Sequence, residues 1–78
     1  MWDYILKASG YTYNEEHDLY YFHQDKYSTI ISLKHLPDQD VTVVNGHMSF
    51  KFTAKCDTLS HIEAIADHQY DLKTMARL

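Results

Sequence analysis

The chain has 78 residues, a formal net charge of −4, 45% hydrophobic residues and one cysteine. A chain of this length forms one domain with a modest core, and its negative charge argues against direct binding to nucleic acid, which needs a basic face. The lone Cys56 excludes an intramolecular disulfide, and no apolar run is long enough to cross a membrane. We therefore expect residues 1–78 to form a single acidic domain that binds neither nucleic acid nor membranes.

The first four residues, Met-Trp-Asp-Tyr, bear on the location of the protein. They lack the basic and apolar regions of a secretion signal, and a single cysteine suits a reducing compartment. The sequence therefore predicts a cytoplasmic protein, in the cytoplasm of the host cell if its origin is viral.

Residues 2–13 fit two different structures. A turn at Ser9-Gly10 would pair Leu6 with Tyr13 and place the apolar side chains on one face of a hairpin. A short helix over residues 2–8 is the alternative. The alternation of apolar and polar side chains favours the hairpin.

Residues 19–23 and 26–34 predict a second hairpin around Gln24-Asp25. A sheet that is apolar on both faces at this point is either covered twice or partly exposed. Residues 35–40, which include Pro37, are expected to form a loop. The apolar side chains of the hairpin divide between its faces, with Phe22, Tyr27, Ile31 and Leu33 on one and Leu19, Tyr21 and Ile30 on the other.

Residues 41–54 carry the clearest hairpin signal in the chain. Asn45-Gly46 is the preferred type I′ turn, because both residues tolerate positive φ. A two-residue loop there sets Val43 opposite Met48 and Val41 opposite Phe50. The face that holds these residues is apolar and the other is polar, so the turn and the alternation predict the same register.

Residues 58–78 predict one α-helix. Ser60 followed by Glu63 has the spacing of a capping box, and Asp57 or Thr58 are alternative caps. The fold class is then α+β, an antiparallel meander of about four to six short strands with one C-terminal helix packed on one face. The residues expected to face the core recur at helical spacing: Ile62, Ile65, Gln69, Leu72 and Ala76.

Residues 10–27 resemble the YD-repeat consensus of Rhs proteins, in which Gly-Tyr-x-Tyr precedes an acidic turn and Leu-Tyr-Tyr. The repeat does not recur along the chain, and Ser28-Thr29 stand where the consensus has Asp-Pro. The resemblance implies β-hairpin chemistry for this stretch and no function.

Two groups of residues are candidates for binding a protein partner. Glu63, Asp67 and Asp71 are spaced four residues apart, about 6 Å along a helix, and the expected buried stripe leaves them pointing to solvent. Such a row could imitate a phosphate backbone in front of a basic cleft, although a solvated polar face is the commoner meaning of a charge run. The second group could equally be ordinary sheet packing, and comprises Tyr11, Tyr13, Tyr20, Tyr21, Glu15, Glu16 and Asp18.

No catalytic centre, metal site or cofactor is predicted. The six histidines include no pair at the i, i+4 spacing of helical zinc ligands. The nearest chelate-like pairs, Asp57/His61 and His68/Asp71, lie on different sides of the helix. Cys56 continues the apolar series of residues 48–54 and is expected to be a buried, inert thiol, so we expect no enzyme activity.

These features favour a small acidic module that binds another protein and inhibits it by occupying a basic, nucleic-acid-binding surface. Short, acidic chains without catalytic motifs are common among phage and mobile-element inhibitors of host defence, including anti-CRISPR proteins, which is a likeness of class without a shared motif. One alternative is a homodimeric structural or regulatory domain that uses its tyrosine-rich sheet face. Another is a histidine-based metal-binding domain. The protein is expected to be a monomer or a homodimer.

Overall fold

A computed structural model of the chain describes residues 1–76. The strands form one antiparallel sheet in the order β1-β2-β3-β4-β5, so each pairs with its neighbours in the sequence. The elements follow one another as α1 (Trp2–Ala8), β1 (Thr12–Asn14), β2 (Leu19–His23), β3 (Ser28–Ser32), β4 (Gln39–Asn45), β5 (Met48–Ala54) and α2 (Leu59–Ala76).

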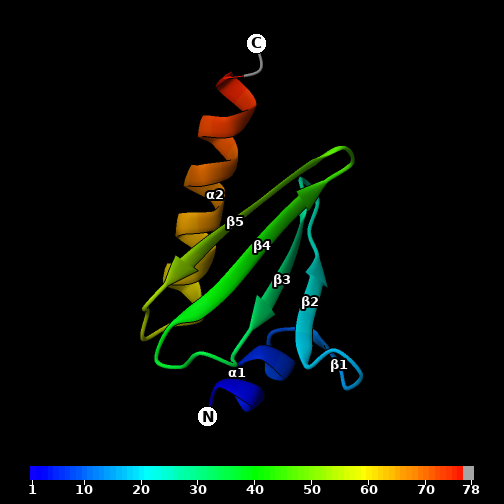
Figure 1. Cartoon of the computed structure of the whole chain (residues 1–78), viewed down its shortest axis with the longest axis vertical. Coiled ribbons are helices and arrows are strands. Elements are labelled where there is room, and N and C mark those ends of the chain that lie inside the picture. The colour runs from blue at the N-terminus through cyan, green and yellow to red at the C-terminus, as the bar shows by residue number, and fades with distance from the viewer. Residues whose placement is uncertain (77–78) are drawn as a thin grey trace.

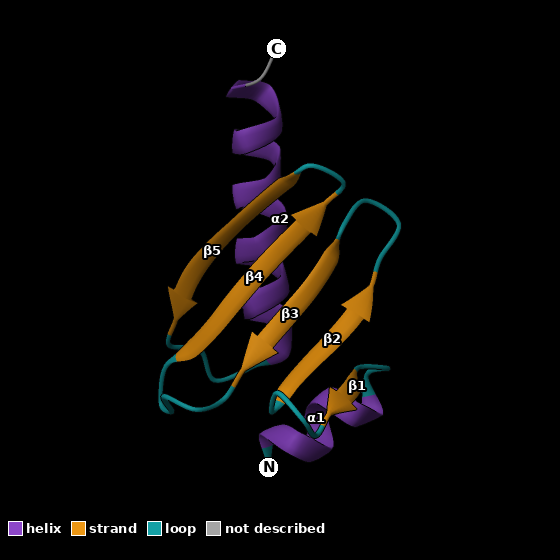
Figure 2. Cartoon of the chain, turned by 45° about the vertical axis from the view of Figure 1, so that its right-hand side comes forward, coloured by secondary structure: helices purple, strands orange, loops and turns teal. Residues whose placement is uncertain are grey.

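The sheet has one covered face and one open face. α2 crosses behind the sheet, and α1 lies at its lower end beside β1 and β2 (Figure 1, Figure 2). The row Tyr20, Ile31 and Val41, which pairs across three strands, is buried on the covered face. The predicted fold class, an α+β meander with a C-terminal helix on one face, is confirmed.

Residues 2–8 form a helix, so the predicted hairpin about Ser9-Gly10 is wrong and its alternative is right. The N–H of Tyr11 donates to the C=O of Leu6 at 3.0 Å, and Gly10 has φ +99. These are the marks of a Schellman motif, in which a left-handed residue ends the helix. The residues that pack on the core have helical rather than alternating spacing: Trp2, Ile5 and Leu6.

The β4–β5 hairpin turns one residue later than predicted. Asn45 pairs with Met48, so the two-residue loop is Gly46-His47 and the register differs from the prediction by two residues. Gly46 has φ +54, which suits the first central position of a type II′ turn. A shift of two residues leaves each side chain on its predicted face, so the faces are right although the register is wrong.

The side chain of Asn45 accounts for the displaced turn. Its amide donates to the C=O of Lys26 at 2.6 Å and to the hydroxyl of Tyr70 at 2.7 Å. Both bonds require Asn45 to remain in the strand on the covered face, where it cannot also serve as a turn residue. Gly46 therefore supplies the positive φ instead.

The β2–β3 hairpin forms in the predicted region and has a four-residue loop, 24–27, because His23 pairs with Ser28. Tyr20 and Ile31 are buried on the covered face. Leu19, Tyr21 and Ile30 are half-buried on the other face, which no described element covers. The sheet is therefore partly exposed where its pattern is apolar on both sides.

α2 begins at Leu59, directly after its cap residue. The hydroxyl of Thr58 accepts the N–H of His61 at 3.2 Å, which is the contact of an N-cap. The predicted capping box starting at Ser60 is therefore wrong, and the alternative cap Thr58 is right. Residues 77–78 of the predicted helix lie outside the described residues.

The buried side of α2 differs from the predicted stripe. It is centred on Ile62 and Ala66, whereas Ile65 and Gln69 are half-buried and Leu72 is 49% exposed. The C-terminal end of α2 projects past the sheet (Figure 1), so its last turn has less of the sheet to pack against. Helical spacing thus predicted an amphipathic helix but not which of its sides meets the sheet.

Gln39 is a buried polar side chain that ties the start of β4 to the chain beyond β5. It is 1% exposed, and its Oε1 accepts the N–H of Cys56 at 3.0 Å while its Nε2 donates to the C=O of Cys56 at 3.2 Å. The side chain thereby satisfies both backbone groups of a buried residue, as a neighbouring strand would.

The Cys56 thiol is buried, as predicted. β4 thus begins inside the stretch 35–40 that was expected to be a loop.

Replacing each of the two glycines that have positive φ by alanine should lower the free energy of unfolding by different amounts. At Gly46 an added Cβ would meet no atom within 4 Å, so Gly46→Ala carries only the strain of a left-handed residue, about 1–2 kcal/mol. At Gly10 the Cβ would lie 3.1 Å from the ring of Phe22, so Gly10→Ala should cost clearly more. Urea unfolding measures both free energies, and equal losses would contradict the placement of Phe22.

Gln39→Leu should destabilise the fold strongly, because it leaves the N–H and C=O of Cys56 buried without partners. Each such group costs about 1–3 kcal/mol. Gln69→Leu, at a half-buried position of α2, is the matched control and should change the free energy of unfolding little. The two variants are compared by urea unfolding, and similar losses would show that the Cys56 backbone groups find other partners.

Candidate protein-interaction surfaces

The acidic row of α2 is only partly free: Asp67 and Asp71 are exposed, whereas Glu63 is half-buried. Asp67 accepts a hydrogen bond from the hydroxyl of Tyr27, and Glu63 is half-buried beside the hydroxyl of Tyr11. Asp71 is exposed and, among the described residues, is the member of the row without such a contact. Two of the three predicted partner-binding carboxylates therefore hold the helix to the sheet.

The rotation of α2 about its axis explains this correction. Successive residues are about 100° apart around a helix. The predicted stripe would place Glu63 about 140° from the centre of the buried side. The observed buried side lies between Ile62 and Ala66, which brings Glu63 to about 80° from its centre, at the margin of the helix–sheet contact.

We call Tyr11, Tyr27, Glu63 and Asp67 the tyrosine–carboxylate seam. Burial raises the pKa of Glu63, and the negative charge of Asp67 raises it further. Burial and the nearby carboxylates also raise the pKa of Tyr11 and of Tyr27, so both hydroxyls remain protonated. Among residues 1–76, the buried hydroxyl of Tyr11 finds no hydrogen-bond partner, and it lies beside Glu63. Asp67 remains exposed although it is bonded to Tyr27, so the role of the acidic row in binding a partner stays a prediction.

The predicted tyrosine patch divides between the core and the surface. Tyr11 and Tyr20 are 4% and 6% exposed, and the hydroxyl of Tyr20 donates to Asp3 at 2.6 Å. The half-buried Tyr13 packs its ring 4.8 Å from that of Tyr20. Tyr21 alternates with Tyr20 along β2 and so lies on the open face. Ordinary packing therefore accounts for Tyr11, Tyr13 and Tyr20, and of these four tyrosines Tyr21 is the one on the open face.

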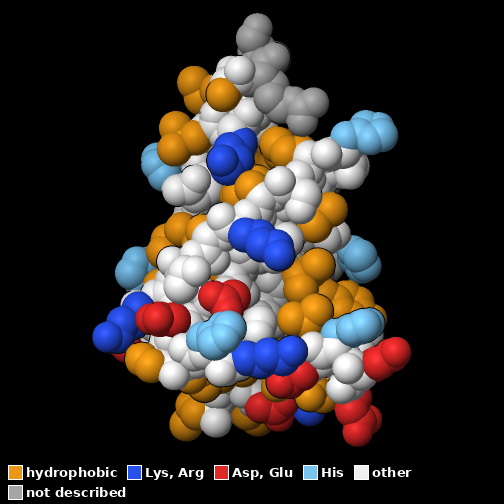
Figure 3. All heavy atoms as spheres, in the orientation of Figure 1, with side chains coloured by type: hydrophobic (Ala, Val, Ile, Leu, Met, Phe, Trp, Pro, Cys, Tyr) orange, Lys and Arg blue, Asp and Glu red, His pale blue; other side chains and the backbone are white. Residues whose placement is uncertain are grey.

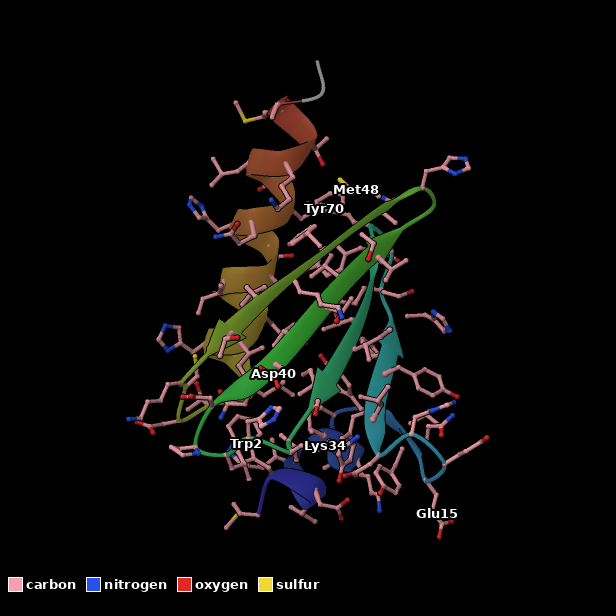
Figure 4. All side chains as sticks on the ribbon, in the orientation of Figure 1. Trp2, Glu15, Lys34, Asp40, Met48 and Tyr70 are labelled. Carbon is pink, nitrogen blue, oxygen red and sulfur yellow. The ribbon has the colours of Figure 1, made fainter. Side chains whose placement is uncertain are left out.

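The turn between β1 and β2 forms an acidic end of the molecule. Its carboxylates Glu15, Glu16 and Asp18 are exposed, and Figure 4 shows Glu15 directed away from the protein. Tyr13 donates to Asp18 at 2.8 Å. That hydrogen bond, together with the charges of Glu15 and Asp3, raises the pKa of Tyr13. The turn thus brings together the predicted site residues Glu15, Glu16 and Asp18, and we refer to these three as the acidic end.

The open face of the sheet is hollowed by a shallow groove of about 550 Å³. Figure 3 shows hydrophobic side chains gathered over β2 and β3, with acidic side chains directly below them. Leu19, Tyr21 and Ile30 are the half-buried apolar residues of this area, and we call them the open-face patch. Leu19 and Ile30 line the groove together with Ser32, Asp40, Thr42 and Lys51.

A histidine–aspartate pair at the lower end of the groove was not predicted from the sequence. His35 Nδ1 lies 2.5 Å from a carboxylate oxygen of Asp40, and the hydroxyl of Thr53 donates to the same carboxylate at 3.3 Å. Hydrogen bonding to His35 lowers the pKa of Asp40. The two residues stand on either side of the Pro37 loop, so no periodic spacing signals their contact.

The histidines do not gather into a metal centre. Across residues 1–76, no three His, Cys, Asp or Glu side chains are placed to hold a metal ion together. His23 bonds to the hydroxyl of Ser28 at 2.7 Å, and His35 is occupied by Asp40. Asp57, His61 and His68 are exposed on α2 or just before it.

The chain matches no protein-family model, and no curated protein or solved structure is significantly similar to it. Within the described residues, no helix is both long and apolar enough to cross a membrane.

Glu63 predicts a pH dependence of stability. Because its pKa is higher in the folded chain, Glu63 stabilises the fold when protonated, below its ordinary pKa of 4.5. This contribution is lost as the pH rises through the folded-state pKa. Glu63→Gln removes the charge, so the variant should gain stability relative to the parent between about pH 4 and pH 7.

Urea unfolding at both pH values measures this gain. Asp71→Asn removes a charge from the same helix at an exposed position and should show a smaller change with pH. A Glu63→Gln variant whose stability relative to the parent is the same at both pH values would contradict the burial of Glu63 at the seam.

Proposed function

We propose that the chain is a small protein-binding module that uses the open face of its sheet together with its acidic end. The observation that carries this proposal is the open-face patch, Leu19, Tyr21 and Ile30, on β2 and β3, where hydrophobic side chains gather directly above acidic ones (Figure 3). An aromatic and aliphatic centre with a charged rim is the usual composition of a protein interface.

Tyr21 is the residue best suited to anchor such a contact. It is half-exposed on the open face, and its ring packs edge-on against His23 with a centroid distance of 6.0 Å. Interface energy concentrates in a few aromatic or arginine side chains near the centre of a contact. The adjoining groove offers room for a side chain of the partner.

The acidic end favours a partner with a basic surface. Glu15 and Glu16 are exposed, and the net charge of −4 adds to their field. Opposite charge at an interface accelerates association and selects among partners. Basic surfaces are the electrostatic mark of nucleic-acid-binding proteins. We therefore propose an inhibitor that occupies such a surface in the cytoplasm, as phage and mobile-element inhibitors of host defence do, with the likeness being one of class.

The test begins with affinity capture of the partner from a host lysate, followed by binding kinetics with the purified partner. Tyr21→Ala should speed dissociation about tenfold or more, as the loss of an anchor does. The double change Glu15→Gln and Glu16→Gln should slow association and reduce its dependence on salt.

The matched control is the double change Asp25→Asn and Asp57→Asn, which removes the same charge from exposed positions outside the proposed surface. It should leave association nearly unchanged. Equal effects of the two double variants would mean that net charge, and not the acidic end, attracts the partner. An unchanged dissociation rate for Tyr21→Ala would exclude the open face as the contact surface.

Competition with duplex DNA tests the inhibitory mechanism separately. If the chain occupies the nucleic-acid site of the partner, DNA should displace it in proportion to the affinity of the partner for DNA. Simultaneous binding of DNA and the chain would retain the binding module but contradict inhibition by occupancy.

A further inference from the structure

β5 is a long edge strand with one side unpaired. It runs over seven residues, Met48–Ala54, and pairs with β4 alone. Figure 2 shows it at the outer margin of the sheet, with α2 behind. Natural sheets protect long edges with charged side chains, especially lysine, with proline or with bulges. β5 has no proline, and its one charged residue is Lys51.

The hairpin geometry identifies the unpaired backbone groups of β5. Asn45 and Met48 close the two-residue loop, and the closing pair of such a hairpin is a hydrogen-bonded pair. Hydrogen-bonded pairs then alternate along the strand. The N–H and C=O groups of Ser49, Lys51 and Thr53 therefore point away from β4, along the free edge.

The flank of α2 next to this edge is apolar and incompletely buried. Glu63 and Asp67 face the tyrosines of the seam, on the β2–β3 side of the helix. At about 100° per residue, Ile65, Gln69 and Leu72 lie on the opposite side, toward β5. Ile65 and Gln69 are half-buried and Leu72 is 49% exposed.

We propose that a second copy of this chain covers the edge, with β5 pairing antiparallel to β5 about a twofold axis and α2 lying beside α2. Each copy carries a charge of −4, so two copies can associate closely only where carboxylates are absent. β5 has none, and the carboxylates of α2, at 63, 67 and 71, lie away from this flank. Such an interface is separate from the open-face patch.

The sequence of β5 is complementary to itself in this arrangement. With Phe50 on the axis, Lys51 lies opposite Ser49 of the second copy, and Phe52 lies opposite Met48. The outward backbone groups of residues 49 and 51 then bond to one another across the axis. A register with Lys51 on the axis would place two ammonium groups face to face, which is unfavourable.

The size of the contact indicates a reversible dimer. With Phe50 on the axis, residues 48–52 of the two copies face one another, so five paired residues span about 17 Å. A sheet with one helix layer is about 20 Å deep. An interface of this outline is smaller than the ~800 Å² per partner of standard complexes, so the dimer is expected to be weak and reversible. A small domain with a modest core has most to gain from such burial.

Sedimentation velocity over a range of concentrations should show a reversible dimer of the full chain. Amide hydrogen exchange gives a second measurement without mutation. In the dimer the N–H groups of Ser49 and Lys51 should be protected like those of Phe50 and Phe52, and this protection should fall on dilution. A monomer at every concentration, with only alternate residues of β5 protected, would overturn the proposal.

Two variants test the geometry. Ser49→Pro removes an outward N–H, which an edge strand tolerates, and should abolish the dimer. Leu72→Asp leaves the strand intact and should raise the dimer dissociation constant at least tenfold, even if Ser49→Pro fails to fold. Ala64→Asp is the control, because residue 64 is exposed on the side of α2 opposite the sheet. A dimer that survives Leu72→Asp, or that Tyr21→Ala disrupts instead, would place the interface elsewhere and overturn the proposal.

Discussion

The coverage of one sheet face by a single helix is the constraint on which the rest of this structure depends. Five strands span roughly 20 Å from edge to edge, whereas one helix covers a strip about 10 Å wide. α1 and the rings of Tyr11, Tyr20 and Tyr27 fill the remainder of that face. Tyrosine supplies a large apolar body, but it also brings a hydroxyl that needs a partner at the margin of the core.

These hydroxyls explain why tyrosines and carboxylates are interleaved in the sequence. Hydrogen bonds to an ionised acceptor are stronger than neutral ones, so a nearby carboxylate is an effective partner for a hydroxyl at the core margin. The interleaving, which in sequence is typical of a contact surface, serves packing here. The donor–acceptor pairs are Tyr13 with Asp18, Tyr20 with Asp3, and Tyr27 with Asp67.

Features that depend on residues close in sequence could be predicted, and those that depend on distant side chains could not. Strand alternation gave the faces of β4 and β5, but their register depends on Asn45 bonding to Tyr70, 25 residues away. The exposure of Glu15 and Glu16 could be predicted, because both lie in a turn between neighbouring strands. The burial of Glu63 depends on the rotation of α2, which helical periodicity leaves undetermined.

Glu15 and Glu16, which the fold does not engage, can act on another molecule, and they lie on a constrained turn. Asp18 is held by Tyr13, and the N–H of His17 donates to the side chain of Asn14 at 3.0 Å. A charged group presented on an ordered turn loses less entropy on binding than one on a mobile tail.

β1 and β5 are the two margins of the sheet. Pairing through β5 would therefore set two acidic ends at opposite margins of one continuous sheet. A basic surface long enough to meet both would bind the second end at a high effective concentration, which raises affinity without any new contact.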